Sequence, residues 1–150
     1  MSASSQWPSV WFEYFAQVQP HHTDYAGVVW HGAYLEWMEA ARIEVFRAVG
    51  LDYADLVKMG CDLPVIELSL RYQQAIPMGK AIVIKSRIRQ IRKVRLFWDQ
   101  HIYCANDVKP RMIGQVTLVP VNTEKGSILR TPPSAFQQAI SHIEQFGKPD

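Results

Sequence analysis

The stretch that decides the fold reads His22-Thr23-Asp24-Tyr25-Ala26-Gly27-Val28-Val29-Trp30-His31-Gly32-Ala33-Tyr34, and a helical pattern continues it to Val49. Gly27 and Gly32 bracket an apolar segment, which predicts a flexible loop that leads into a helix. Asp24 then lies in a tight turn just before the longest helix that the sequence can form. A carboxylate beside a helix N-terminus is well placed to attack a carbonyl group that the helix polarises.

From Ala33 to Val49 the apolar residues recur with the helical period. One continuous apolar arc contains Tyr34, Trp37, Met38, Ala41, Val45, Ala48 and Val49, and Leu35 with Phe46 forms a second, smaller patch. A helix that is apolar over so much of its circumference needs cover on more than one side. Gly50 is suited to end it in the left-handed conformation.

Alternation of apolar and polar residues predicts strands around this helix, at 10–19, 66–72, 82–89, 96–104 and 112–118. We expect a short helix within 51–59, a loop at 123–130 and a C-terminal helix from 134. Because the last four strands follow one another with short links, they should form an antiparallel meander. The predicted fold is α+β: a sheet of about five strands wrapped round one long central helix, in a single domain over residues 1–150.

The composition is that of an ordinary globular protein, with 48% hydrophobic residues, 20% charged residues and a net charge of +2. No apolar run approaches the roughly 20 residues of a membrane span, and the first residues lack the pattern of a signal peptide. Cys61 and Cys104 fit neither a disulfide framework nor a paired zinc site, so we expect two buried thiols. A cytoplasmic protein with no membrane or nucleic-acid partner is predicted.

The motif Asp24-x-x-Gly27-Val28-Val29-x-His31-x-x-Tyr34-Leu35, after a strand and at the start of a long helix, resembles a known family. It is similar to the 4-hydroxybenzoyl-CoA thioesterase branch of the hotdog-fold superfamily, and most of all to YbgC-type acyl-CoA thioesterases. The run Glu39-Ala-Ala-Arg42-x-Glu44 extends the resemblance along the helix. Trp30 and His22 depart from the family pattern beside the acyl pocket, which puts substrate identity in doubt more than chemistry.

The resemblance implies that Asp24 is the catalytic carboxylate, either as the nucleophile on the thioester carbonyl or as the base that activates water. The residues alone leave another interpretation, in which Asp24 only caps its own turn. The resemblance also implies that the backbone N–H of His31 polarises the carbonyl, as free N–H groups at a helix start can do. The His31 side chain either orients substrate or water, or forms a hydrogen bond within the loop.

The substrate pocket is expected beside this turn, with Gly27, Val28, Val29, Trp30 and Tyr34 as substrate-binding candidates and Trp37 as either pocket or core. We expect no metal site. His21 and His22 are adjacent at the end of a strand, so their side chains should point to opposite faces, and no carboxylate or cysteine lies at ligand spacing. Glu39 is a second candidate carboxylate, since related hotdog thioesterases use a helix glutamate. A salt bridge to Arg42 three residues on is the preferred interpretation of Glu39.

Six cations crowd residues 85–95: Lys85, Arg87, Arg89, Arg92, Lys93 and Arg95. They form a solvated face, a nucleic-acid patch or a seat for the phosphates of coenzyme A. The near-neutral net charge and the lack of aromatic residues between these cations disfavour nucleic acid. Arg92 and Lys93 are assigned to the coenzyme A phosphates, because they lie in the turn where their reach is greatest.

The predicted activity is hydrolysis of an acyl-CoA or aryl-CoA thioester to a carboxylic acid and free CoA. No cofactor is needed beyond the coenzyme A that is part of the substrate. Two alternatives stay open: an acyl-carrier-protein thioesterase and a non-catalytic module that binds acyl-CoA or a protein. Because hotdog proteins generally pair strands across a dimer, the resemblance also implies a homodimer or a dimer of dimers, that is, a homotetramer.

Overall fold

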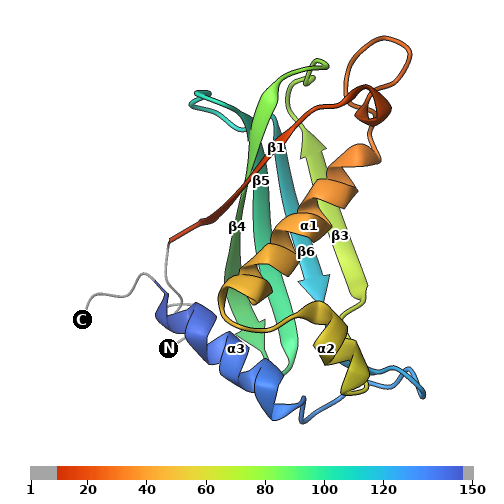
Figure 1. The fold of residues 1–150 in the computed structure, drawn as a ribbon, viewed down its shortest axis with the longest axis vertical. Helices are drawn as coiled ribbons and strands as arrows, with labels where there is room; N and C mark the ends of the chain where they lie inside the picture. The colour runs from red at the N-terminus through yellow and green to blue at the C-terminus, as the bar shows by residue number, and fades with distance from the viewer. Residues whose placement is uncertain (1–9, 147–150) are drawn as a thin grey trace.

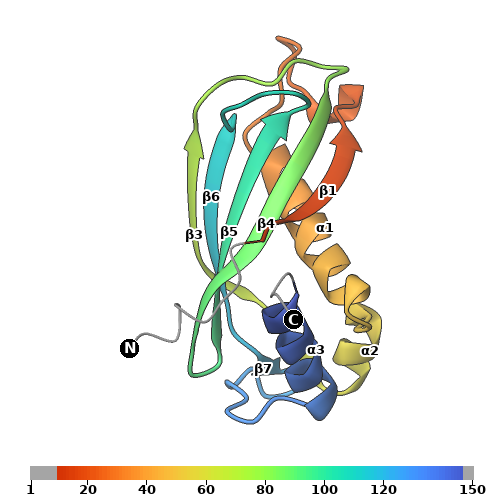
Figure 2. The same cartoon turned by 90° about the vertical axis from the view of Figure 1, so that its left-hand side faces the viewer.

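The computed structural model describes residues 10–146, in which a five-stranded antiparallel sheet curls round one long helix (Figures 1 and 2). The strands are β1 (Phe12–Gln17), β2 (Cys61–Asp62), β3 (Val65–Tyr72), β4 (Ala81–Arg92), β5 (Arg95–Cys104), β6 (Met112–Leu118) and β7 (Val121–Asn122). The helices are the 3₁₀ turn η2 (Pro20–His22), α1 (Ala33–Ala48), α2 (Tyr53–Lys58) and α3 (Ser134–Gln145). The predicted α+β hotdog architecture is confirmed.

Helix α1 begins and ends where its periodicity predicts, and its apolar arc is the centre of the core. Its buried residues are Ala33, Tyr34, Trp37, Met38, Ala41, Arg42, Val45 and Phe46. The Met38 side chain of the helix packs closely over Gly114, where an added Cβ would lie 2.8 Å from Met38 Cε and 3.2 Å from the backbone oxygen of Gln100. A glycine on β6 thus lets the helix lie against the sheet.

The sheet order is β1-β4-β5-β6-β3, so the predicted four-strand meander is wrong for β3, which pairs with β6 at the far edge. The connection at 73–80 is the reason, because it is held by the loop before α1. Its fully buried Ile76 accepts a hydrogen bond from the Val29 N–H at 2.9 Å, and the Val18 N–H bonds Lys80 at 2.9 Å. These contacts carry the chain away from β3 and start β4 beside β1.

Small elements close the lower end of the sheet in Figure 2. Strands β2 and β7, which the sequence does not predict, pair with each other, and Asp52 caps α2 through the Ala54 N–H at 3.2 Å. Helix α3 buries Phe136 against Phe46 of α1, with 6.0 Å between the ring centroids. The two-strand pairing forms a second short sheet that periodicity over so few residues cannot reveal.

Both cysteines are buried free thiols, as predicted. Burial raises the pKa of Cys61 to about 11, so it stays protonated and is no nucleophile at neutral pH. Within residues 10–146, no helix has the length and apolar character needed to cross a membrane.

Candidate active site

A short two-stranded ribbon connects the turn of Asp24 to the start of α1. The Asp24 N–H donates to Val28 O at 2.9 Å, and the Trp30 N–H donates to His22 O at 3.1 Å. Gly27 closes the turn with φ +81°, a conformation that L side chains rarely adopt. His31 follows the last rung directly, so the ribbon fixes Asp24 relative to the helix N-terminus.

The Asp24 carboxylate is exposed and is held by its own turn. Its Oδ1 accepts the Ala26 N–H at 2.9 Å and the Val28 N–H at 3.5 Å, which is the capping geometry that the residues alone allowed. No hydrogen bond between described residues uses Oδ2. One oxygen therefore orients the carboxylate, while the other accepts no hydrogen bond from the residues that the structure describes.

Helix α1 starts irregularly, which leaves donors free. The Ala33 N–H bonds Trp30 O at 3.0 Å and the Leu35 N–H bonds Gly32 O at 3.2 Å, both with the short 3₁₀ spacing. Among the hydrogen bonds of residues 10–146, none uses the N–H of His31 or Gly32. These N–H groups lie at the positive end of the helix dipole, where developing negative charge is stabilised.

A cavity of about 290 Å³ adjoins this helix start and is lined by Val29, His31, Tyr34, Tyr72, Gln73, Gln74 and Ala75. Tyr34 is 3% exposed, and its ring meets that of Tyr72 edge to face at 5.1 Å. Burial raises the pKa of Tyr34, so it stays a neutral phenol. The sequence did not predict that residues Tyr72 to Ala75 line this cavity. They lie at the end of a strand that is distant in sequence from the helix start, and no motif marks them.

The other residues predicted to bind substrate lie outside the cavity wall. Trp30 is exposed, and its indole covers Gly32, where an added Cβ would lie 2.2 Å from the ring. Trp37 is core, 5% exposed and with its ring 4.7 Å from that of His22. Gly27 and Val28 shape the ribbon rather than the cavity wall. The structure thus brings together Val29, His31 and Tyr34 from the predicted set.

His22 is held in the turn by a hydrogen bond to its ring. Its Nδ1 accepts the Gln19 N–H at 2.8 Å, so this nitrogen carries no proton. Burial, followed by repulsion from His21, lowers the pKa of His22, whereas Glu36 opposes the shift. Across residues 10–146, no three histidine, cysteine or acidic side chains gather as metal ligands.

The predicted salt bridge between Glu39 and Arg42 is wrong. Arg42 is 8% exposed and donates instead to Gln100 Oε1 on β5 at 2.9 Å, whereas Glu39 stays exposed. Because the helix buries Arg42 against the sheet, the guanidinium finds its partner there and not along the helix.

The first three cations of the basic segment are paired on the outer face of the sheet. Arg87 and Arg89 flank the buried Asp99 at 3.1 and 3.3 Å, and Lys85 approaches Glu13 at 4.0 Å. No aromatic residue stands between these cations in the sequence, but other segments place aromatic rings beside them: Trp11, Phe97 and Tyr103. The solvated-face interpretation describes these three residues.

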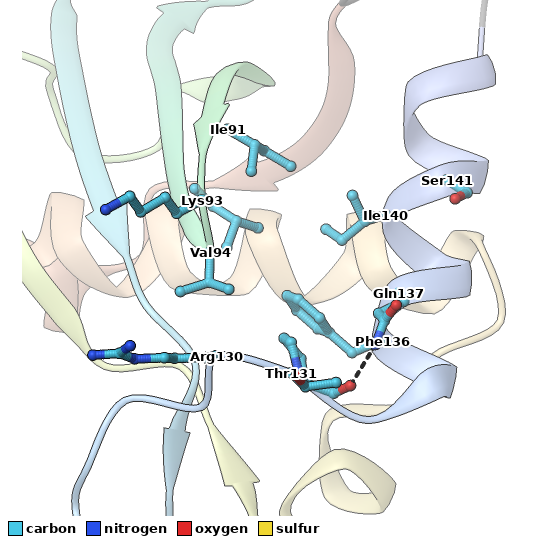
Figure 3. A pocket seen from close by; sticks show the side chains of 11 residues that line it. Ile91, Lys93, Val94, Arg130, Thr131, Phe136, Gln137, Ile140 and Ser141 are labelled. Carbon is cyan, nitrogen blue, oxygen red and sulfur yellow. Dashed lines mark hydrogen bonds between the residues drawn. The ribbon is translucent and has the colours of Figure 1, made fainter. Parts of the chain in front are cut away.

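Arg92 and Lys93 lie at the other end of β4 from Asp24. Lys93 is at the tip of the β4–β5 hairpin with φ 58°, beside a slot of about 470 Å³ between the hairpin and α3 (Figure 3). Asp24 belongs to the end where Met78 N–H bonds Gly27 O at 3.0 Å, just before β4. The 12 residues of β4 span about 40 Å, so a single chain does not bring these residues together.

Comparison with known proteins agrees with this fold. The family model described as "Thioesterase-like superfamily" matches residues 18–140. The Synechocystis protein named "Putative esterase sll0410" is 50% identical over 135 residues, 90% of this chain and 81% of its own length. The Bacillus subtilis protein named "Putative acyl-CoA thioesterase YneP" is 30% identical over 87 residues, 58% of this chain and 63% of its own length.

Among solved structures, the DHNA-CoA thioesterase of Staphylococcus aureus superposes with a TM-score of 0.82 at 23% identity, over 93% of this chain and 97% of that one. That likeness supports the fold, and the family model with the 50% identical relative decides the family. The chain belongs to the thioesterase-like superfamily of hotdog proteins and is a thioester hydrolase.

Proposed function

We propose that the protein hydrolyses an acyl-CoA thioester to a carboxylic acid and free CoA, with Asp24 and the start of α1 as its catalytic machinery. One observation carries the proposal: a short ribbon connects an exposed carboxylate, oriented by its own turn, to a helix start whose N–H groups at His31 and Gly32 are unused by described residues. The similarity to YneP, which is named as a putative acyl-CoA thioesterase, and to the staphylococcal DHNA-CoA thioesterase supports coenzyme A as the carrier.

Asp24 acts either as base or as nucleophile. As base, its carboxylate takes a proton from water while the water oxygen bonds to the thioester carbon. As nucleophile, it forms an acyl-aspartyl anhydride and expels CoA thiolate, and water then hydrolyses the anhydride. In both routes the carbonyl oxygen gains negative charge, which the His31 N–H stabilises. The CoA thiolate leaves and takes up a proton, so no cofactor is required.

The acyl group is assigned to the cavity bounded by Val29, Tyr34 and Tyr72. Its volume of about 290 Å³ and its two phenol rings suit a compact acyl or aryl group. Ranking short, long and aromatic CoA thioesters by kcat/KM defines the preference.

A homodimer paired through β3 accompanies this proposal. Strand β3 is an edge strand, bonded only to β6 within the described sheet, and it exposes Val65, Ile66, Leu68 and Tyr72 by 42 to 50%. An unpaired apolar edge is a ready template for a second strand. Pairing two antiparallel copies would bring the hairpin end of one chain toward the Asp24 end of the other, which is where Arg92 and Lys93 would be needed. Two such dimers would form the tetramer.

The central test follows thiol release from CoA thioesters by the wild type and by Asp24→Asn. Asparagine keeps the oxygen that caps the turn but cannot attack or take a proton, so we expect kcat to fall by about 10² or more at unchanged melting temperature. Asp52→Asn is the matched control, because Asp52 caps α2 in the same way and lies outside the site. Equal rates for wild type and Asp24→Asn would remove Asp24 from the chemistry.

An acyl-carrier-protein thioester is the second candidate substrate. Arg92, Lys93, Arg95 and Arg130 form no ion pair with described residues and gather round the hairpin tip, which suits an acidic carrier. Free CoA should compete with an acyl-CoA substrate, whereas turnover of a carrier-bound thioester should be indifferent to it.

A further inference from the structure

A tyrosine from the far edge of the sheet reaches back to the start of the catalytic helix. The Tyr72 hydroxyl, at the end of β3, donates to the backbone carbonyl of His31 at 2.8 Å. Both residues line the 290 Å³ cavity. The contact joins two segments 41 residues apart and forms a polar link between β3 and the site.

This hydrogen bond fills a gap that the helix leaves. The short 3₁₀ hydrogen bonds at the start of α1 are accepted by the carbonyls of Trp30 and Gly32, and neither is accepted by the carbonyl of His31. No backbone N–H among the described residues donates to His31 O, so the Tyr72 hydroxyl is the donor that satisfies it. The peptide between His31 and Gly32 is therefore held by a side chain and not by the helix.

Holding a carbonyl also aims the N–H of the same peptide. In a trans peptide the two groups point in opposite directions, so fixing His31 O fixes the Gly32 N–H. The Ala33 N–H fixes the preceding peptide in the same way through Trp30 O at 3.0 Å, and with it the His31 N–H. Two successive donors thus have set directions, one set by the backbone and one by Tyr72.

The backbone that carries the Tyr72 side chain is fixed by hydrogen bonds. Tyr72 pairs with Met112 of β6, and the N–H groups of Gln73 and Gln74 both donate to Arg111 O, at 2.9 and 3.2 Å. The hydroxyl is consequently delivered from a fixed strand end, which is what a positioning group requires.

We propose that Tyr72 is a positioning residue: its hydroxyl holds the His31–Gly32 peptide so that the Gly32 N–H serves, beside that of His31, as a second donor to the thioester oxyanion. This inference rests on the proposed function. Preorganised donors act mainly on the transition state, so losing the hydroxyl lowers kcat and leaves substrate binding in place.

The kinetic test is Tyr72→Phe, which keeps the ring and removes the hydroxyl. We expect kcat to fall about tenfold, with KM within about twofold and an unchanged melting temperature, because loosening a donor costs less than deleting one. Tyr103→Phe is the matched control, since its ring lies under Lys85 on the outer face of the sheet. An unchanged kcat, or a loss of activity that follows a lowered melting temperature, would overturn the proposal.

A second readout does not depend on turnover. In ¹⁵N-labelled protein, Tyr72→Phe should shift the Gly32 amide resonance and speed its hydrogen exchange, and Tyr103→Phe should do neither. An unaltered Gly32 amide in Tyr72→Phe would refute the positioning role. If the wild type hydrolyses no thioester, the proposed function fails, while this amide measurement still decides whether Tyr72 orients the peptide.

Discussion

The Arg42 guanidinium on α1 donates a 2.9 Å hydrogen bond to the Gln100 side-chain oxygen on β5, inside an otherwise apolar interface. The Gln100 amide nitrogen completes the link, donating to Met38 O on α1 and to Ser86 Oγ on β4, each at 2.9 Å. Gln100 and Ser86 are fully buried. One amide therefore ties to two strands the helix whose N-terminus we propose as part of the catalytic machinery.

Replacing Gln100 with leucine should destabilise the protein by about 3 kcal/mol, because it leaves a buried charge and a buried carbonyl without their partner. Urea unfolding measures this loss. Gln115→Leu, on the exposed side of β6, is the matched control and should cost less than about 0.5 kcal/mol. Equal losses for the two variants would show that the network contributes no stability.

Local patterns predicted the helix and the turn well, because their causes are local. The period of α1, the left-handed Gly50 that follows it and the glycine turn at Gly27 each depend on residues within a few positions of one another. The geometry at Asp24 was likewise foreseen as one of two alternatives, since an aspartate can bond the N–H groups that follow it.

Contacts between distant segments escaped the sequence interpretation. The pairing of β3 with β6 depends on how Ile76 is buried under the loop before α1, which no strand pattern encodes. Arg42 was assigned to its helix neighbour Glu39 because spacing alone cannot show that burial favours Gln100. Tyr72 gave no local signal, since its role requires a strand end and a helix start to meet.

Trp30 and Gly32 should behave as a coupled pair. In Gly32→Ala the new Cβ would occupy the place of the indole, so the ring must swing out, with a change in tryptophan fluorescence and a fall in kcat. When Trp30 is already alanine, the Cβ added by Gly32→Ala meets no indole ring. The double variant should therefore be only slightly less active than Trp30→Ala alone. Full additivity of the two changes in a double-mutant cycle would contradict this packing.

Acid should loosen the turn at His22. Its folded pKa is lowered below 6.5, mainly by burial, so the folded state binds its proton less readily than the unfolded state. The stabilisation of the folded state by neutral His22 is complete above about pH 6.5. It is lost as the pH falls toward the pKa of His22 in the folded state, because a protonated Nδ1 can no longer accept the Gln19 N–H. An NMR titration of the His22 ring measures the midpoint. A midpoint at or above 6.5 would refute the prediction.

A charge on the exposed edge should separate the proposed dimer. Ile66→Lys places an ammonium on β3, where Ile66 is 46% exposed, and should shift the mass measured by light scattering from dimer to monomer at micromolar concentration. Val108→Lys is the matched control, because Val108 is 93% exposed in the loop after β5. A dimer that survives Ile66→Lys but not Val108→Lys would move the interface to that loop.

The separation of Asp24 from Arg92 and Lys93 makes the proposed phosphate seat testable by mixing variants. Arg92→Ala/Lys93→Ala alone should raise KM for CoA thioesters and leave kcat nearly unchanged, because these cations would bind the phosphates far from the carbonyl. Asp24→Asn alone should be nearly inactive. If the cations of one copy serve the carboxylate of the other, a mixed dimer of the two variants contains one intact site.

Refolding the two variants together in equal amounts, and assaying well below the raised KM, should restore about a quarter of wild-type activity per subunit, because half of the dimers are mixed and each has one intact site of two. Each variant refolded alone is the control. Activity no greater than the sum of these controls would mean that no second copy supplies the cations. Because Arg92 and Lys93 lie at the opposite end of the roughly 40 Å strand β4 from Asp24, that result would also remove both residues from the coenzyme A site.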